Sequence, residues 1–137
     1  WSSDVCSSDL DVRIITPHIP DKWYVHAVTK SFYRELLKTG IKIYEYTPGF
    51  IHAKNVICDD KIATVGTVNF DYRSFYHNFE CGTWMYETKA IQEMKNDFVK
   101  TREESMEITE EIVNKTPLFQ RILQELLKFF SPMLWFI

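Results

Sequence analysis

Several side chains that could act on a phosphodiester lie between residues 50 and 80 of this 137-residue chain. His52 and Lys54 stand two residues apart, and Asp59 follows five residues after the lysine. Near neutral pH a histidine can act as nucleophile or acid, and a lysine supplies a compact positive charge. Residues two apart on a strand point to the same side, so His52 and Lys54 are expected to meet one phosphate group together.

A second set of polar residues follows within the same stretch. Gly66 and Thr67 are followed by Asn69. Further along, Glu80 is the carboxylate that is a candidate for the site. The Asn69 amide and the Thr67 hydroxyl are donors for phosphate oxygens as charge builds on them. Glu80 is suited to hold the imidazole tautomer by accepting its second N–H group. Either His52 or Lys54 alone would be read as an ordinary structural residue, but the combination favours a catalytic site.

For Asp59 and Arg73 the sequence allows two interpretations each. Asp59 stands where a strand is expected to end, so it either braces a hairpin turn or contacts substrate, and the turn is favoured. Arg73 either binds a headgroup phosphate or pairs with an acidic neighbour. The remaining histidines and cysteines lack the spacing of zinc ligands, and His18 is only a candidate for the rim of the site.

The first part of the chain predicts a strand, a helix and a parallel strand. Val12–Thr16 is a β-branched run, and Lys22–Thr39 has helical periodicity with Asp21 as its expected cap. Gly40 stands where a helix commonly ends, and Ile41–Tyr46 alternates as a half-buried strand does. This order is typical of a βαβ unit.

The next part predicts the elements that position the site. Phe50–Cys58 is expected to be a strand that carries His52 and Lys54, joined through a tight turn at residues 59–61 to a strand at Ile62–Val65. An irregular aromatic segment follows, and Phe79–Tyr86 is expected to be the strand that carries Glu80. Three helices should complete the chain: Thr88–Ser105, Ile108–Asn114 and Leu118–Phe130. The fold class expected is α/β, with a mixed β-sheet flanked by helices.

The composition narrows the classes of function. The hydrophobic share of 45% fits a globular domain. The net charge of −3 weakly disfavours a dedicated nucleic-acid binder, although it is compatible with a local basic patch. The three cysteines are an odd number without C-x-x-C spacing, which disfavours a disulfide scaffold. No run of 18 apolar residues is present, although the apolar C-terminal tail is compatible with either a membrane surface or a protein core.

The first ten residues differ from the rest of the sequence. Residues 1–10, WSSDVCSSDL, lack periodicity and are similar to the translation of a common sequencing adapter. They are therefore expected to be non-native, and residues 11–137 are expected to be a C-terminal domain of a longer protein.

The pattern His52-x-Lys54-x4-Asp59-x6-Gly66-Thr67-x-Asn69 is similar to the HKD signature of the phospholipase D superfamily. Glu80 stands where that superfamily usually has its histidine-orienting carboxylate. Flanking segments resemble the bacterial cardiolipin synthase family from Asp11 to Ile137; they are TPHIPDKW, YEYTPGFIHAKN, VGTVNFDYRSFYHNFECG and FFSPML.

This resemblance implies a phospholipase D-like half domain that carries the second of two HKD motifs. The whole enzyme would join two phosphatidylglycerol molecules into cardiolipin and glycerol through a phosphohistidine, without a metal or other cofactor. Its partners would be phosphatidylglycerol, the membrane surface and the missing N-terminal HKD half, and its location would be the bacterial cell membrane. The resemblance leaves open whether His52 is the nucleophile or the general acid.

Two alternatives accompany this expectation. A phospholipase D-type phosphodiesterase or nuclease would act as a homodimer of single-HKD chains. A remnant without turnover would bind phosphate or lipid only. The negative net charge of the chain and the flanking segments that resemble cardiolipin synthase disfavour the nuclease.

Overall fold

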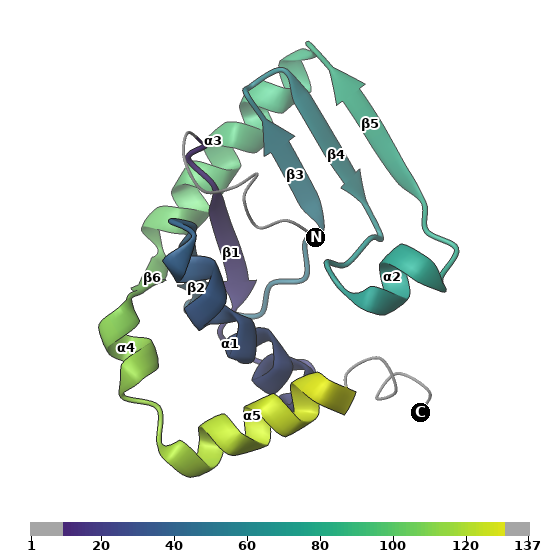
Figure 1. The fold of residues 1–137 in the computed structure, drawn as a ribbon. Coiled ribbons are helices and arrows are strands. Elements are labelled where there is room, and N and C mark those ends of the chain that lie inside the picture. The colour runs from purple at the N-terminus through teal and green to yellow at the C-terminus, as the bar shows by residue number, and fades with distance from the viewer. Residues whose placement is uncertain (1–9, 131–137) are drawn as a thin grey trace. The chain divides into compact units, whose positions relative to one another are not determined.

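The computed structural model describes residues 10–130, which form two compact units (Figure 1). Unit 1 contains the described residues up to Ile51 and from Glu104 onward, and unit 2 contains His52–Glu103. The α/β class is confirmed, with the strands divided between two three-stranded sheets, one in each unit. The expected adapter-derived segment at residues 1–10 and the apolar tail after residue 130 lie outside the described residues, apart from residue 10.

Unit 1 begins with the predicted βαβ arrangement. Strand β1 (Arg13–Pro17) and strand β2 (Lys42–Tyr46) are joined through helix α1 (Trp23–Lys38). The strands are parallel, with Arg13 opposite Lys42. Gly40 has a φ of +84°, a left-handed conformation in which glycine is not strained, and it lets the chain turn from the helix into β2.

The predicted cap of α1 is wrong. The residue with extended backbone at the helix start is Lys22, whose side chain makes no capping hydrogen bond. Asp21 therefore lies one residue too early for its carboxylate to reach the free N–H groups of the first turn.

The C-terminal part of unit 1 contains a strand that the sequence did not reveal. Strand β6 (Ser105–Ile108) pairs antiparallel with β2. Helix α4 (Glu110–Asn114) begins after it, with the Thr109 side chain accepting from the Ile112 N–H. The predicted helix start at Ile108 is therefore wrong, whereas helix α5 (Leu118–Phe130) has the predicted bounds.

The core of unit 1 lies between α1 and the sheet. Its buried members are Tyr33, Ile41, Ile43 and Ile108. Burial raises the pKa of the Tyr33 hydroxyl, which lies 2.8 Å from the Thr16 hydroxyl.

Unit 2 contains the sheet β3 (Asn55–Cys58), β4 (Ile62–Gly66) and β5 (Gly82–Tyr86), with all neighbours antiparallel. Asp59 and Asp60 have φ of 50° and 58°, as in the two-residue turns that favour hairpins. The predicted hairpin between β3 and β4 is thus confirmed.

Two helices complete unit 2. Helix α2 (Tyr72–Tyr76) lies within the segment that was expected to be irregular, and Asp71 caps it by accepting from the Ser74 N–H at 2.8 Å. Helix α3 (Lys89–Glu103) follows β5, and Lys95 donates to the Asp60 carboxylate at the hairpin turn. Ile91 of α3 and Ala63 of β4 are each 1% exposed, so they form the buried centre of this unit.

Candidate active site

His52 and Lys54 lie before the first strand of unit 2 and not within it. Strand β3 begins at Asn55, so the predicted strand Phe50–Cys58 is wrong at its first five positions. The reason is pairing: β4 ends at Gly66, opposite Gly82, and the last contact toward the N-terminus of β3 is the Gly66 N–H donating to the Lys54 carbonyl at 3.1 Å. Strand alternation therefore does not place His52 and Lys54 on one face.

The two residues are nevertheless close neighbours in the structure. The Lys54 ammonium donates to the His52 carbonyl oxygen at 3.1 Å. Lys54 is half-buried and the His52 side chain is exposed. The lysine charge is thus held next to the histidine by a local hydrogen bond.

Glu80 precedes β5 by two residues, so its predicted place within a strand is wrong. The carboxylate is fixed by side-chain donors: the Thr67 hydroxyl donates to Oε2, and the Asn78 amide donates to Oε1 at 3.1 Å. Each oxygen therefore accepts a hydrogen bond from a neutral group, and Glu80 has a defined orientation without lying in the sheet.

Thr67 holds this arrangement to the end of the sheet. Its N–H donates to the Cys81 carbonyl at 2.9 Å, and its hydroxyl oxygen accepts from the Cys81 N–H at 3.0 Å. The single hydroxyl proton has two acceptors within reach, the Glu80 carboxylate and the Cys81 carbonyl at 3.3 Å, and the charged carboxylate is the closer one. A hydroxyl residue is therefore required here, which serine or threonine can provide.

Gly66 permits the close approach of the strands just before Thr67. A Cβ atom at Gly66 would lie 2.5 Å from the Cys81 carbonyl oxygen and 2.7 Å from the Gly82 Cα. Both contacts are with backbone atoms that cannot move aside easily. The glycine of the Gly-Thr-x-Asn sequence is thus a packing requirement of the site.

The hydrogen bonds lower the pKa of Glu80. The largest contribution comes from the Thr67 hydroxyl, followed by Ser74 and Asn78, with a smaller one from the Lys54 charge. Donors that bind the ionised form favour it. Glu80 is therefore a carboxylate near neutral pH, ready to accept from an imidazole N–H.

Asn78 was missed in the sequence and links two of the candidates. Its amide donates to Glu80, and its carbonyl oxygen accepts from Arg73 Nε at 2.8 Å. Asn69 lies nearby in the hydrogen-bond network, because its N–H donates at 3.2 Å to the hydroxyl of Ser74, which is buried. A polar residue two positions before Glu80 was the one available signal.

Asp59 is not brought together with the other candidates. It lies in the turn between β3 and β4, whereas Thr67 follows β4 at its other end. The favoured expectation, a role in the turn, agrees with this position.

Large apolar side chains are exposed in the same unit. Phe79 next to Glu80 is fully exposed, and Phe70 next to Asn69 is 82% exposed. Two exposed rings therefore stand next to candidate site residues in the sequence of unit 2.

Comparisons with known proteins identify the family of the chain. A family model described as "Cardiolipin synthase, PLD-like domain" matches residues 3–102. The chain belongs to this family. The match confirms the resemblance seen in the sequence.

Individual relatives extend the match to most of the chain. A cardiolipin synthase of Alkalihalophilus pseudofirmus is 39% identical over 127 residues, which are 93% of this chain and 25% of that protein. Cardiolipin synthase 2 of Bacillus cereus is 42% identical over 125 residues, 91% of this chain and 24% of that protein. A protein of Streptococcus mutans described as uncharacterized is 45% identical over 125 residues, 91% of this chain and 27% of that protein. The chain thus spans about a quarter of the length of these relatives.

Two features are absent from the part of the chain that the structure describes. Within residues 10–130, no helix has both the length and the apolar character needed to cross a bilayer. In the same range, no three histidine, cysteine or acidic side chains are arranged to hold a metal ion.

Proposed function

We propose that this chain supplies one half-site of an enzyme that transfers a phosphatidyl group between two phosphatidylglycerol molecules, giving cardiolipin and glycerol. The observation that carries the proposal is the oriented Glu80 carboxylate, held by Thr67 and Asn78 in a member of the cardiolipin synthase family. The enzyme would work at the bacterial cell membrane, where its substrate is found.

In this proposal His52 and Lys54 act on the phosphate together. The imidazole of His52 serves as nucleophile or general acid, and Lys54 offsets the charge on the non-bridging oxygens. Asn69 and Thr67 lie in the same hydrogen-bond network, and Arg73 supplies a further cation for the headgroup. Glu80 accepts from the second ring N–H of His52 and stabilises the imidazolium form.

The reaction needs two histidines. The ring nitrogen of one attacks phosphorus, the bond from phosphorus to the glycerol oxygen breaks, and the other histidine donates a proton to that oxygen. A hydroxyl of the second phosphatidylglycerol then attacks the phosphohistidine, returning its proton to the second histidine and freeing the first. The H-x-K pattern occurs once in this sequence, so the opposing set must come from another half-site.

The test is the substitution His52→Ala in a longer protein that contains this half. Cardiolipin formation from phosphatidylglycerol vesicles should fall by about a thousandfold or more, because members of a catalytic unit are not replaceable. The matched control is His77→Ala, which removes another exposed histidine of unit 2 and should leave the rate within about twofold of the parent. Retained activity in His52→Ala would contradict the assignment.

A second measurement tests the two-half arrangement. The 137-residue chain alone should form no cardiolipin from phosphatidylglycerol vesicles, since it carries one histidine-lysine pair. Turnover by a chain shown to be monomeric would refute the need for an opposing half-site.

A further inference from the structure

Helix α5 carries its apolar side chains on its outward surface. A surface helix ordinarily turns its apolar stripe toward the core and its charges toward water. In α5 the arrangement is reversed: Arg121, Gln124 and Lys128 are half-buried. The exposed apolar residues recur at helical spacing and are Leu118, Phe119, Ile122, Leu123, Leu126, Phe129 and Phe130. We call these seven residues the apolar face of α5.

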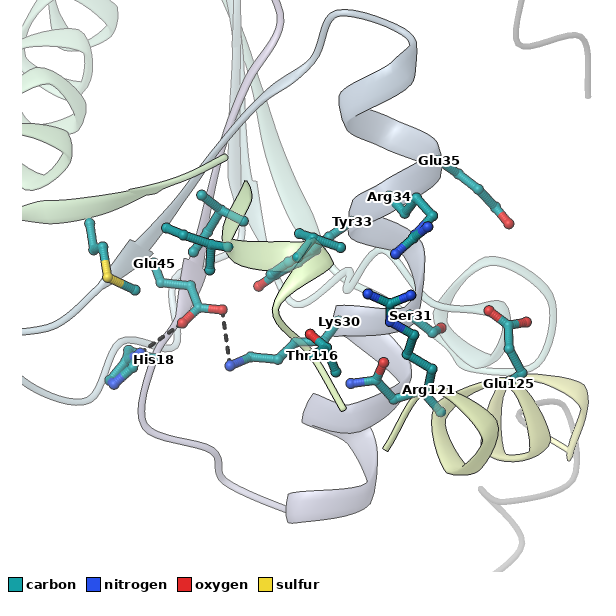
Figure 2. A pocket seen from close by; sticks show the side chains of 15 residues that line it. His18, Lys30, Ser31, Tyr33, Arg34, Glu35, Glu45, Thr116, Arg121 and Glu125 are labelled. Atoms are coloured by element: carbon teal, nitrogen blue, oxygen red, sulfur yellow. Dashed lines mark hydrogen bonds and ion pairs between the residues drawn. The ribbon is translucent and has the colours of Figure 1, made fainter. Parts of the chain in front are cut away.

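The polar side of α5 meets α1 around a cavity of about 210 Å³ in unit 1. Arg34 of α1 and Arg121 of α5 both line it, and Figure 2 shows their guanidinium groups turned toward one another. Both groups donate to one residue: Arg34 to the side-chain oxygen of Asn114 at 3.1 Å, and Arg121 to its backbone carbonyl. Two cations are thus drawn together by neutral acceptors.

Neither arginine has an acidic partner in the part of the chain that the structure describes, residues 10–130. Arg121 Nε is buried and lacks a hydrogen-bond acceptor among those residues. A buried donor without an acceptor is unfavourable, and an anion that supplied the acceptor would relieve it.

The acidic residues that line the cavity are placed differently. Glu35 is 63% exposed and pairs with Lys128 at 2.6 Å, and in Figure 2 its carboxylate points away from the two guanidinium groups. Glu45 pairs with Lys30 and His18. Glu125 also lines the cavity, one helical turn after Arg121, and lies beyond ion-pair distance from it. The two guanidinium groups therefore remain available to an anion.

We propose that α5 lies on an anionic phospholipid surface, with its apolar face among the acyl chains and a lipid phosphate bound by Arg34 and Arg121. Two guanidinium groups provide the bidentate donors that phosphate oxygens accept. A helix with a wide apolar face beside cationic groups is the usual form of an interfacial element. The arginine pair lies on the side of α5 that meets α1 and the apolar face lies on the opposite side, so the two features contact different parts of the lipid surface, the headgroup phosphates and the acyl chains. This inference does not depend on the transfer reaction.

The first test identifies what covers the apolar face. A photoreactive benzoylphenylalanine replaces Phe119 in a longer protein that contains this chain, and the protein is irradiated in phosphatidylglycerol vesicles. Crosslinks to lipid are expected. Crosslinks to another part of the same protein, or to a second copy, would overturn the proposal and identify the face as a protein interface. The same label at Gln92, exposed on α3 in unit 2, is the control and should give much less lipid adduct.

The second test examines the arginine pair with the 137-residue chain and vesicles of phosphatidylglycerol and phosphatidylcholine. The double substitution Arg34→Gln, Arg121→Gln should weaken binding about thirtyfold, at roughly 1 kcal/mol for each basic residue at an anionic surface. The control Lys89→Gln, Lys100→Gln removes the same charge from exposed positions of α3 and should change binding by less than about threefold. Equal losses in both would overturn the proposal, because they would show that net charge alone attracts the chain to the vesicle.

Two further experiments test whether the variants fold normally and whether the bound phosphate belongs to a lipid. The substitutions Arg34→Lys and Arg121→Lys keep the charge and should retain part of the affinity, with an unchanged circular dichroism spectrum. Glycerol 3-phosphate at millimolar concentration should not displace the chain from vesicles, because it has no acyl chains for the apolar face. Displacement would show that the site takes a free phosphate and would overturn the lipid assignment.

Discussion

Two carboxylates, one in each unit, are both held ionised but by different means. Glu45 on β2 is 1% exposed; its burial acts to raise the pKa, and His18 at 2.7 Å with Lys30 at 3.3 Å outweighs it, so that the pKa is lowered. Glu80 has no such burial, and its pKa is lowered chiefly by hydrogen bonds from neutral side chains, with Thr67 first.

The difference separates a structural carboxylate from one that can act. The carboxylate of Glu45 pairs with the Lys30 ammonium of α1 and is hydrogen-bonded to the His18 ring of the loop after β1, so it ties these elements to the sheet of unit 1. The charge of Glu80 is oriented by neutral donors and stays available for an incoming cation such as an imidazolium. The lesson is that a lowered pKa alone does not mark a functional acid; the kind of partner does.

The largest effect is expected when the buried Glu45 carboxylate is removed. Glu45→Ala should lower the free energy of unfolding by about 3 kcal/mol, because it removes the common buried partner of Lys30 and His18. Chemical denaturation of the 137-residue chain measures this loss, with the exposed Glu107→Ala as control, expected within about 0.5 kcal/mol of the parent. A loss below about 1 kcal/mol would show that the buried cluster does not hold unit 1 together.

A substitution at Glu80 should lower the rate of cardiolipin formation more than the stability of the chain. Glu80→Gln keeps the shape of the side chain but removes the charge that stabilises an imidazolium, so cardiolipin formation in the longer protein should fall by about a hundredfold. The free energy of unfolding should change by less than about 1 kcal/mol, because glutamine fills the same half-buried position and keeps one side-chain oxygen as an acceptor. Glu93→Gln, on the exposed surface of α3, is the control for charge alone. A large stability loss with an unaltered rate would make Glu80 a structural residue like Glu45.

The sequence predicted the fold well where local pattern decides it. The periodicity of α5, the turn at Asp59 and Asp60 and the βαβ order all reflect local propensities, and the structure agrees. It failed where long-range pairing decides. Whether residues 50–54 form a strand depends on where β4 ends, and β6 exists because β2 offers it an edge, neither of which a local pattern contains.

The site shows the same division. The spacing of His52, Lys54, Thr67 and Asn69 was visible in the sequence. The hydrogen bond from Thr67 to Glu80 was not, because it forms across the end of a sheet between residues that are far apart in the sequence. The burial of Glu45 could have been predicted from the sequence. The alternation of Ile41, Ile43 and Glu45 put a carboxylate on the buried face of its strand, and such a position requires cationic partners.

The smallest expected effect is a change in the pKa of Glu80, and it tests directly whether hydrogen bonds from neutral groups keep this carboxylate ionised. Its pKa is depressed in the folded chain, so its stabilising contribution is present above the unfolded pKa and is lost as the pH falls through the folded value. Thr67→Val removes the largest donor and should raise the pKa toward its ordinary value of about 4.3, whereas Thr67→Ser should leave it low. Carbon-13 NMR of the side-chain carboxyl measures both. If the valine variant kept the low value, the Thr67 hydroxyl would not be the main source of the shift, and the remaining partners Ser74, Asn78 and Lys54 would hold the charge of Glu80.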